Sequence, residues 1–201
     1  MFELIQSARF HGLRAEARAR VGADWPPVTD HFPGAPILPG SMQIELCAQL
    51  AGPLAERAVK AQHDVERWAF VAMVRNAVFQ RPVRLPATIE LRAELKRVGA
   101  TNVRAAAEAT TTNVRAAAEA TTTNMRAAGE ATTAGEATTT GDDAQQLRAV
   151  EPMTVHAGVE AIVEGAQVCR AELVIMMLEA EPTWASALAE ARARVARWER
   201  A

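Results

Sequence analysis

Residues His31–Gly52, which read HFPGAPILPGSMQIELCAQLAG, restrict the possible folds of this chain more than any other stretch. Prolines at positions 33, 36 and 39 and glycines at 34 and 40 exclude a helix from the first half and favour a stiff loop. Gly40 or Ser41 is then a suitable N-cap. The following residues are apolar on nearly every side, which predicts a buried helix from about Ser41 to Val59.

Two polar residues, Glu45 and Gln49, lie one turn apart on this predicted helix. Taken singly, a loop histidine or a helix glutamate is usually an ordinary solvated residue. The combination is more specific, because carboxylates are seldom placed inside a core without a role. A histidine on a rigid loop, N–H groups at a helix start and a buried acid supply a base, an anion-stabilising end and a proton donor. His31 and Glu45 are therefore candidate catalytic residues.

The run HFPG-x-P-I-L-P-G, followed by a helix with Glu45 fourteen residues after His31, resembles the active-site segment of the hot-dog-fold 3-hydroxyacyl-(acyl-carrier-protein) dehydratases. The resemblance assigns His31 to the catalytic histidine and Glu45 to the catalytic acid, which in that family face each other across a dimer interface. Gly40 matches the glycine whose N–H polarises the thioester carbonyl, with the N–H of Ser41 beside it. Gln49 matches the amide of the E-A-x-A-Q run.

Two further segments are similar to this family in the same order. MVRNAVFQRPVRLP at 73–86 is similar to its strand of the form I-D-x-A-x-F-x-R-P-V-x-P-G-D, and VEGAQVCRAELVIMML at 163–178 to its last hairpin. The chain contains no tyrosine, so the aromatic residue that often lines the acyl tunnel of the family would be Phe70 or Trp68.

The resemblance implies an α+β hot-dog fold, in which an antiparallel sheet wraps around a long buried helix. It also implies dehydration of 3-hydroxyacyl thioesters to trans-2-enoyl thioesters in fatty-acid or polyketide-type biosynthesis. The substrate would be carried on the phosphopantetheine of acyl carrier protein, without a metal or redox cofactor, by a homodimer or higher homo-oligomer. The alternatives are a hot-dog thioesterase, an enoyl isomerase that uses the same two residues, and a non-catalytic acyl-binding or scaffold subunit.

Composition narrows the remaining function classes. The formal net charge of −2 and the lack of a basic patch interleaved with aromatics give no case for nucleic-acid binding. Cys47 and Cys169 are interpreted as small buried hydrophobes in a reducing compartment. No apolar run is long enough to span a membrane, and the N-terminus does not resemble a signal sequence, so the cytoplasm is the expected location.

Period-two alternation predicts the strands, and a helical stripe predicts the last element. We expect strands over 11–21, 68–79, 88–98 and 167–178, and a helix from Pro182 with Trp184, Leu188, Ala191, Val195 and Trp198 on one docking face. The predicted organisation is a hot-dog domain over 1–181 and a C-terminal helix over 182–201.

An eleven-residue repeat, TNVRAAAEATT, recurs with asparagines at 102, 113 and 124 and degenerates towards residue 150. Each copy offers one Val or Met for burial, so we interpret 101–150 as a low-complexity insertion in a turn between two strands. The segments 102–109 and 155–163 then compete for one place in the sheet. The segment 155–163 is favoured, because the Val163-Glu164-Gly165 turn makes a short hairpin with the next strand.

Overall fold

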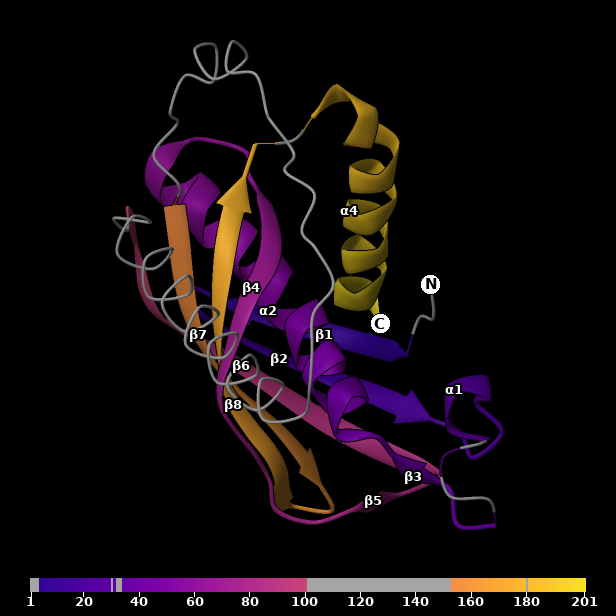
Figure 1. Cartoon of the computed structure of the whole chain (residues 1–201). Helices are drawn as coiled ribbons and strands as arrows, with labels where there is room; N and C mark the ends of the chain where they lie inside the picture. Colours follow the sequence, from indigo (N-terminus) through magenta and orange to yellow (C-terminus); the bar gives the residue numbers. More distant parts are fainter. Residues whose placement is uncertain (1–3, 30, 32–33, 101–152, 180) are drawn as a thin grey trace, which may run out of the picture. The chain divides into compact units, whose positions relative to one another are not determined.

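The computed structural model describes residues 4–29, 31, 34–100, 153–179 and 181–201. They form a six-stranded antiparallel sheet with helix α2 packed on it and a C-terminal helix, α4 (Figure 1). The order of the strands in the sheet is β1-β2-β6-β7-β8-β4, so β1 and β4 are its two edges. The α+β architecture predicted from the sequence is confirmed.

The first two strands form a hairpin, β1 (Ile5–His11) and β2 (Arg14–Val21). The prediction of one strand from His11 to Val21 is wrong at its start. Gly12 adopts a φ of +57°, which a glycine tolerates in a tight turn, and the turn ends β1 at His11. Within β2 the burial alternates strictly, as the sequence predicts, with alanines and Val21 facing the core.

The central strands are β6 (Ala87–Ala100), β7 (Met153–Val163) and β8 (Ala166–Leu178). β7 lies between β6 and β8, so segment 155–163 fills the disputed place as predicted. The competing segment 102–109 and the repeat up to residue 150 lie outside the described residues. Glu164 and Gly165, with φ values of 51° and 77°, form the hairpin turn that joins Val163 to Ala166.

Among the described strands, β4 (Trp68–Phe79) pairs with β8 alone, and it carries two register irregularities, between Val71 and Met73 and between Arg75 and Val78. Asn76, inside the second irregularity, has a φ of 50°. Large apolar side chains are exposed along this edge strand: Phe70, Val74, Val78 and Phe79. The predicted bounds of β4 are confirmed.

Helix α2 (Gly40–His63) is longer than predicted and ends where Asp64 enters the left-handed region with φ 53°. Its buried residues recur every three or four positions and face the sheet, with Leu46, Leu50 and Leu54 completely buried. The prediction that the helix is buried all round is wrong, because Ser41 and Glu45 lie off this stripe and are exposed in the protomer.

The C-terminal segment forms a 3₁₀ turn, Pro182–Trp184, and helix α4 (Ala185–Arg200), which packs against β1. The predicted docking face is confirmed at Leu188, Val195 and Trp198, which are buried, whereas Trp184 is exposed. The boundary between a 1–181 domain and a separate helix stays a prediction. None of the described helices has the length and apolar character needed to span a bilayer.

Both cysteines are buried free thiols, Cys47 on α2 and Cys169 on β8. Burial raises the pKa of the Cys47 thiol far above its ordinary value and that of Cys169 to about 11. These thiols are therefore packing groups of the core and are poor nucleophiles.

Leu54→Ala should lower the free energy of unfolding by about 3 kcal/mol, because it leaves a cavity between α2 and the sheet. The matched control is Leu13→Ala at the β1–β2 turn, where the leucine is 52% exposed. That control should change stability by less than about 0.5 kcal/mol. Urea unfolding followed by circular dichroism measures both, and equal losses would contradict the packing described.

Candidate active site

The loop that precedes α2 is held at both ends by backbone hydrogen bonds. Helix α1 (Pro26–Thr29) leads into His31, whose N–H donates to the Val28 carbonyl at 3.1 Å. At the other end β3 (Ile37–Leu38) pairs with β5 (Val83–Arg84), and the Leu85 N–H donates to the Pro36 carbonyl at 3.0 Å. His31 is half-buried, and residues 30, 32 and 33 of the motif lie outside the described residues.

The start of α2 presents two backbone donors. The N-cap is Pro39, not Gly40 or Ser41 as predicted, and its carbonyl accepts from the N–H groups of Met42 and Gln43 at 3.0 and 3.1 Å. The N–H groups of Gly40 and Ser41 precede Met42, whose N–H is the first to donate into the helix, and no hydrogen bond among the described residues uses them. Together with the helix dipole they can stabilise a developing oxyanion.

Gly40 is required by the close approach of Phe79 from the end of β4. A Cβ at position 40 would lie 2.9 Å from the Phe79 ring, so a larger residue would displace the ring or the helix start. Of the two aromatic residues expected from the sequence to line the acyl tunnel, Phe70 is 54% exposed on the edge strand, whereas Trp68 lines the cavity described below. Phe79 was missed, although it stands before Arg81-Pro82 in the segment that matches the family.

Glu45 and Gln49 are joined as their spacing predicts. The Gln49 Nε2 donates to the Glu45 Oε1 at 2.9 Å, which fixes the orientation of the carboxylate. The expectation of a core position is wrong for the protomer, because Glu45 is exposed and Gln49 half-buried. α2 turns its apolar stripe to the sheet, and position 45 lies on the other side. The structure thus brings Gly40, Ser41, Glu45 and Gln49 together on one helix, with His31 on the loop before it.

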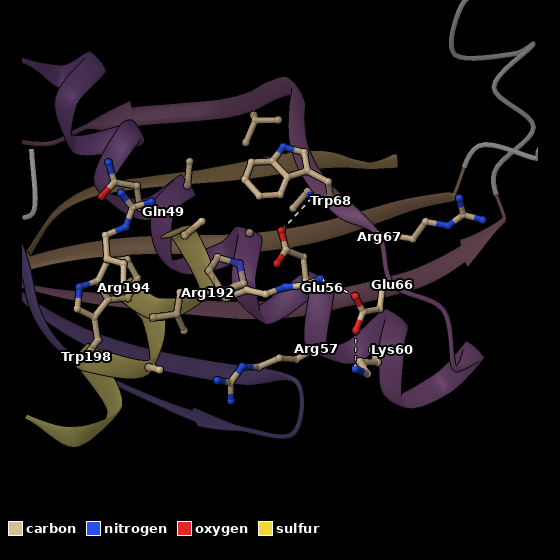
Figure 2. Close-up of a pocket in the computed structure, with 18 of the residues that line it drawn as sticks. Gln49, Glu56, Arg57, Lys60, Glu66, Arg67, Trp68, Arg192, Arg194 and Trp198 are labelled. Carbon is tan, nitrogen blue, oxygen red and sulfur yellow. Dashed lines mark hydrogen bonds and ion pairs between the residues drawn. The ribbon is translucent and has the colours of Figure 1, made fainter. Parts of the chain in front are cut away.

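A cavity of about 500 Å³ begins at Glu45 and Gln49 and runs along α2 between the start of β4 and α4 (Figure 2). Small apolar residues form part of its wall, and charged residues line its far end. The charged and aromatic lining residues beyond Gln49 are Glu56, Arg57, Lys60, Glu66, Arg67, Trp68, Arg192, Arg194 and Trp198.

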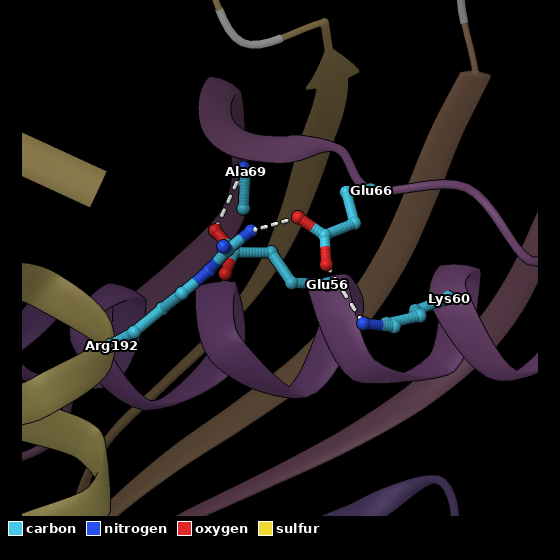
Figure 3. Close-up of polar contacts among 5 residues, drawn as sticks. All are labelled: Glu56, Lys60, Glu66, Ala69 and Arg192. Atoms are coloured by element: carbon cyan, nitrogen blue, oxygen red, sulfur yellow. Dashed lines mark hydrogen bonds and ion pairs between the residues drawn. The ribbon is translucent and has the colours of Figure 1, made fainter. Parts of the chain in front are cut away.

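Glu56 is the unexpected residue of this cavity. It is half-buried and accepts the Ala69 N–H at 3.1 Å (Figure 3). Burial raises the pKa of the Glu56 carboxyl above its ordinary value, against the opposing effects of the Ala69 hydrogen bond and the Arg192 charge. From the sequence, Glu56 is expected with Arg57 and Lys60 at the wetter end of the helix, near the surface, and its partial burial is not predicted, although it follows Gln49 on the same face of the helix.

An ion-pair cluster closes the far end of the cavity. Glu66 pairs with Lys60 at 2.7 Å and with Arg192 at 2.8 Å (Figure 3), and these hydrogen bonds lower the pKa of its carboxyl. Arg192 belongs to α4, so the cluster ties α4 to α2 and to the loop before β4. Among the described residues, no group of three or more His, Cys, Asp or Glu side chains is arranged to hold a metal ion.

Several known dehydratases are similar in sequence to this chain. A 3-hydroxyacyl-[acyl-carrier-protein] dehydratase FabZ of Chlamydia trachomatis is 33% identical over 93 residues, which cover 46% of this chain and 60% of the relative. The FabZ of Anaeromyxobacter sp. is 35% identical over 91 residues, covering 44% of this chain and 58% of that protein. The match therefore spans about 60% of the length of these curated relatives.

Solved structures with the same arrangement of elements identify the hot-dog fold. A proposed esterase of Mycobacterium tuberculosis aligns with a TM-score of 0.51 at 12% identity, over 89% of this chain and 94% of the other. The AziG protein of S. sahachiroi aligns with a TM-score of 0.50 at 15% identity, over 88% of this chain and 92% of the other. At these identities the likeness concerns the fold alone.

The family model described as "ApeI-like: ApeI dehydratase" matches residues 7–117, more than half of the chain. This range includes the His31 loop, the start of α2 and the Glu45–Gln49 pair. The chain therefore belongs to the ApeI-like dehydratase family, which here is built on a hot-dog fold.

Proposed function

We propose that this protein dehydrates 3-hydroxyacyl thioesters carried by acyl carrier protein to trans-2-enoyl thioesters. The observation that carries the proposal is the grouping, in a chain of this family, of two helix-start N–H donors with an oriented carboxylate on α2. The Gly40 and Ser41 donors precede Glu45 by little more than one turn, and Gln49 holds the Glu45 oxygen. The FabZ names of the relatives support the substrate class.

The proposed reaction needs two proton transfers. The thioester carbonyl accepts hydrogen bonds from the N–H groups of Gly40 and Ser41, which stabilise enolate character as it develops. His31 removes the proton from the carbon next to the carbonyl, and Glu45 gives a proton to the hydroxyl on the following carbon. The carbon–oxygen bond breaks, water leaves and the double bond forms, so no step uses a metal or redox cofactor.

The complete site is proposed to form in a homodimer. Glu45 is exposed in one protomer, so its carboxylate is accessible to a second copy that covers it and faces it with a histidine. No described strand pairs with the outer edge of β4, and Phe70, Val74 and Val78 are exposed along it. Such an edge is a template for strand pairing. We assign His31 of one protomer and Glu45 of the other to each site.

Thioester hydrolysis is the second candidate, and the exposure of Glu45 favours it. An exposed carboxylate has access to water and could activate it as a general base towards the carbonyl held by Gly40 and Ser41. The two reactions differ in product, because hydrolysis releases a free thiol and dehydration does not. The isomerase and scaffold alternatives would give no enoyl thioester from the 3-hydroxyacyl substrate.

Glu45→Gln and His31→Ala should each lower kcat for 3-hydroxybutyryl thioester dehydration by roughly 10²–10⁴-fold, because each removes one proton transfer. Enoyl absorbance and free thiol are followed together. Glu90→Gln, an exposed carboxylate change on β6, is the matched control and should leave both readouts unchanged. Thiol release by the wild-type protein without enoyl product would show that the activity is hydrolysis and not dehydration. Near-wild-type turnover by either variant would refute the assigned roles.

Mixing the two inactive variants tests whether the site spans two chains. A heterodimer of His31→Ala and Glu45→Gln contains one site with both intact residues, so activity should return on subunit exchange. If both residues acted within one chain, every site in the mixture would lack one of them and activity would stay absent. Differently tagged chains, isolated as heterodimers by two affinity steps, allow the measurement.

A further inference from the structure

The cavity along α2 extends far beyond the atoms that the proposed reaction uses. Glu45, Gln49, Glu56 and Lys60 follow one another on the face of α2 that lines it. Glu56 lies eleven residues after Glu45, a separation of about 16 Å along the helix axis. A substrate whose reacting end lies at Glu45 therefore has space for a long acyl chain before it meets Glu56.

The wall between these two carboxylates suits a hydrocarbon chain. It is formed by small residues of α2 and β4, which include Ala48, Gly52, Ala69 and Val71. α2 and β4 approach closely here, since a Cβ added to Gly52 would lie 3.5 Å from the Ala69 Cβ. Because the side chains on both elements are small, they do not fill the cavity beside this contact.

Glu56 then presents an acceptor at the far end of this apolar wall. Among the described residues, the Ala69 N–H is the one hydrogen bond made to its carboxylate, which can accept several. Arg192 lies beside it but donates to Glu66, and Lys60 pairs with Glu66 as well (Figures 2 and 3). Glu56 thus retains acceptor capacity in a partly desolvated place.

We propose that the cavity holds the distal part of the acyl chain and that Glu56 accepts a hydrogen bond from a hydroxyl group at the distal end. A plain hydrocarbon end would strip water from the carboxylate without replacing its hydrogen bonds, which is unfavourable. A hydroxyl end replaces the lost water. The substrate class is then a 3-hydroxyacyl thioester with a second, terminal hydroxyl. This inference rests on the proposed dehydratase function.

The test compares two substrates of equal length, a 3-hydroxyhexadecanoyl thioester and its analogue with a terminal hydroxyl, whose chains are long enough to span the distance from Glu45 to Glu56. The wild-type protein should favour the analogue in kcat/KM by about tenfold or more, as expected for a hydrogen bond to a charged acceptor. Glu56→Leu should abolish or reverse this preference, and Glu56→Gln, which keeps an acceptor oxygen, should retain part of it. Glu190→Gln, an exposed change on α4 outside the cavity lining, should retain all of it.

A third substrate separates this inference from the proposed function. 3-Hydroxybutyryl thioester is too short to reach Glu56, so all variants should turn it over equally. Turnover of the short substrate with equal rates for the two longer ones would overturn the inference alone. If no substrate is turned over, the affinities of the two longer thioesters are measured by calorimetry. Tighter binding of the thioester with the terminal hydroxyl, lost in Glu56→Leu, supports the inference. Equal binding of the two refutes it. Thermal unfolding of each variant verifies that α4 remains docked.

Discussion

Burial of one face of α2 against the sheet is the contact on which the other features depend. Leu46, Leu50 and Leu54 lose all access to solvent there, and each contributes roughly 1.5–3 kcal/mol by the usual area relation. The same contact fixes the rotation of the helix about its axis. With the leucines facing the sheet, Glu45 and Gln49 must lie on the opposite side. The N–H groups of Gly40 and Ser41 then point away from the helix at its N-terminus, which follows the His31 loop.

Ion pairs of α4 are the second set of contacts that organises the structure. Trp198 and Val195 bury apolar surface, while Arg192 pairs with Glu66 and Glu199 pairs with Arg57 of α2 at 2.7 Å. These partly exposed ion pairs add little stability individually, but they set the position of the helix. α4 forms one wall of the cavity, and the charge of its Arg192 lowers the pKa of Glu56 against the larger, raising effect of burial.

Local patterns predicted much of this molecule. Strict alternation located β2 and β6, and the Pro/Gly loop followed by an apolar run located the start of α2 and the His31 and Glu45 candidates. The failures have one cause, the dependence of burial on neighbours far away in the sequence. The sequence of the helix does not determine which of its faces packs against the sheet, so Glu45 was predicted to lie in the core. Glu56 was assigned to the wetter end of the helix, because its partial burial and its hydrogen bond from the Ala69 N–H depend on residues outside the helix. The roles of His31, Glu45 and Gln49 stay predictions.

The position of α4 also bears on how far copies of this chain can assemble. A sheet with two free edges can add strands at both and grow into an open-ended fibre. Here α4 packs against β1, one terminal strand, so β4 is the terminal strand that stays accessible. If two copies pair through β4, the accessible sheet edge of each copy is covered by the other. The C-terminal helix then acts as a terminator of assembly as well as a wall of the cavity.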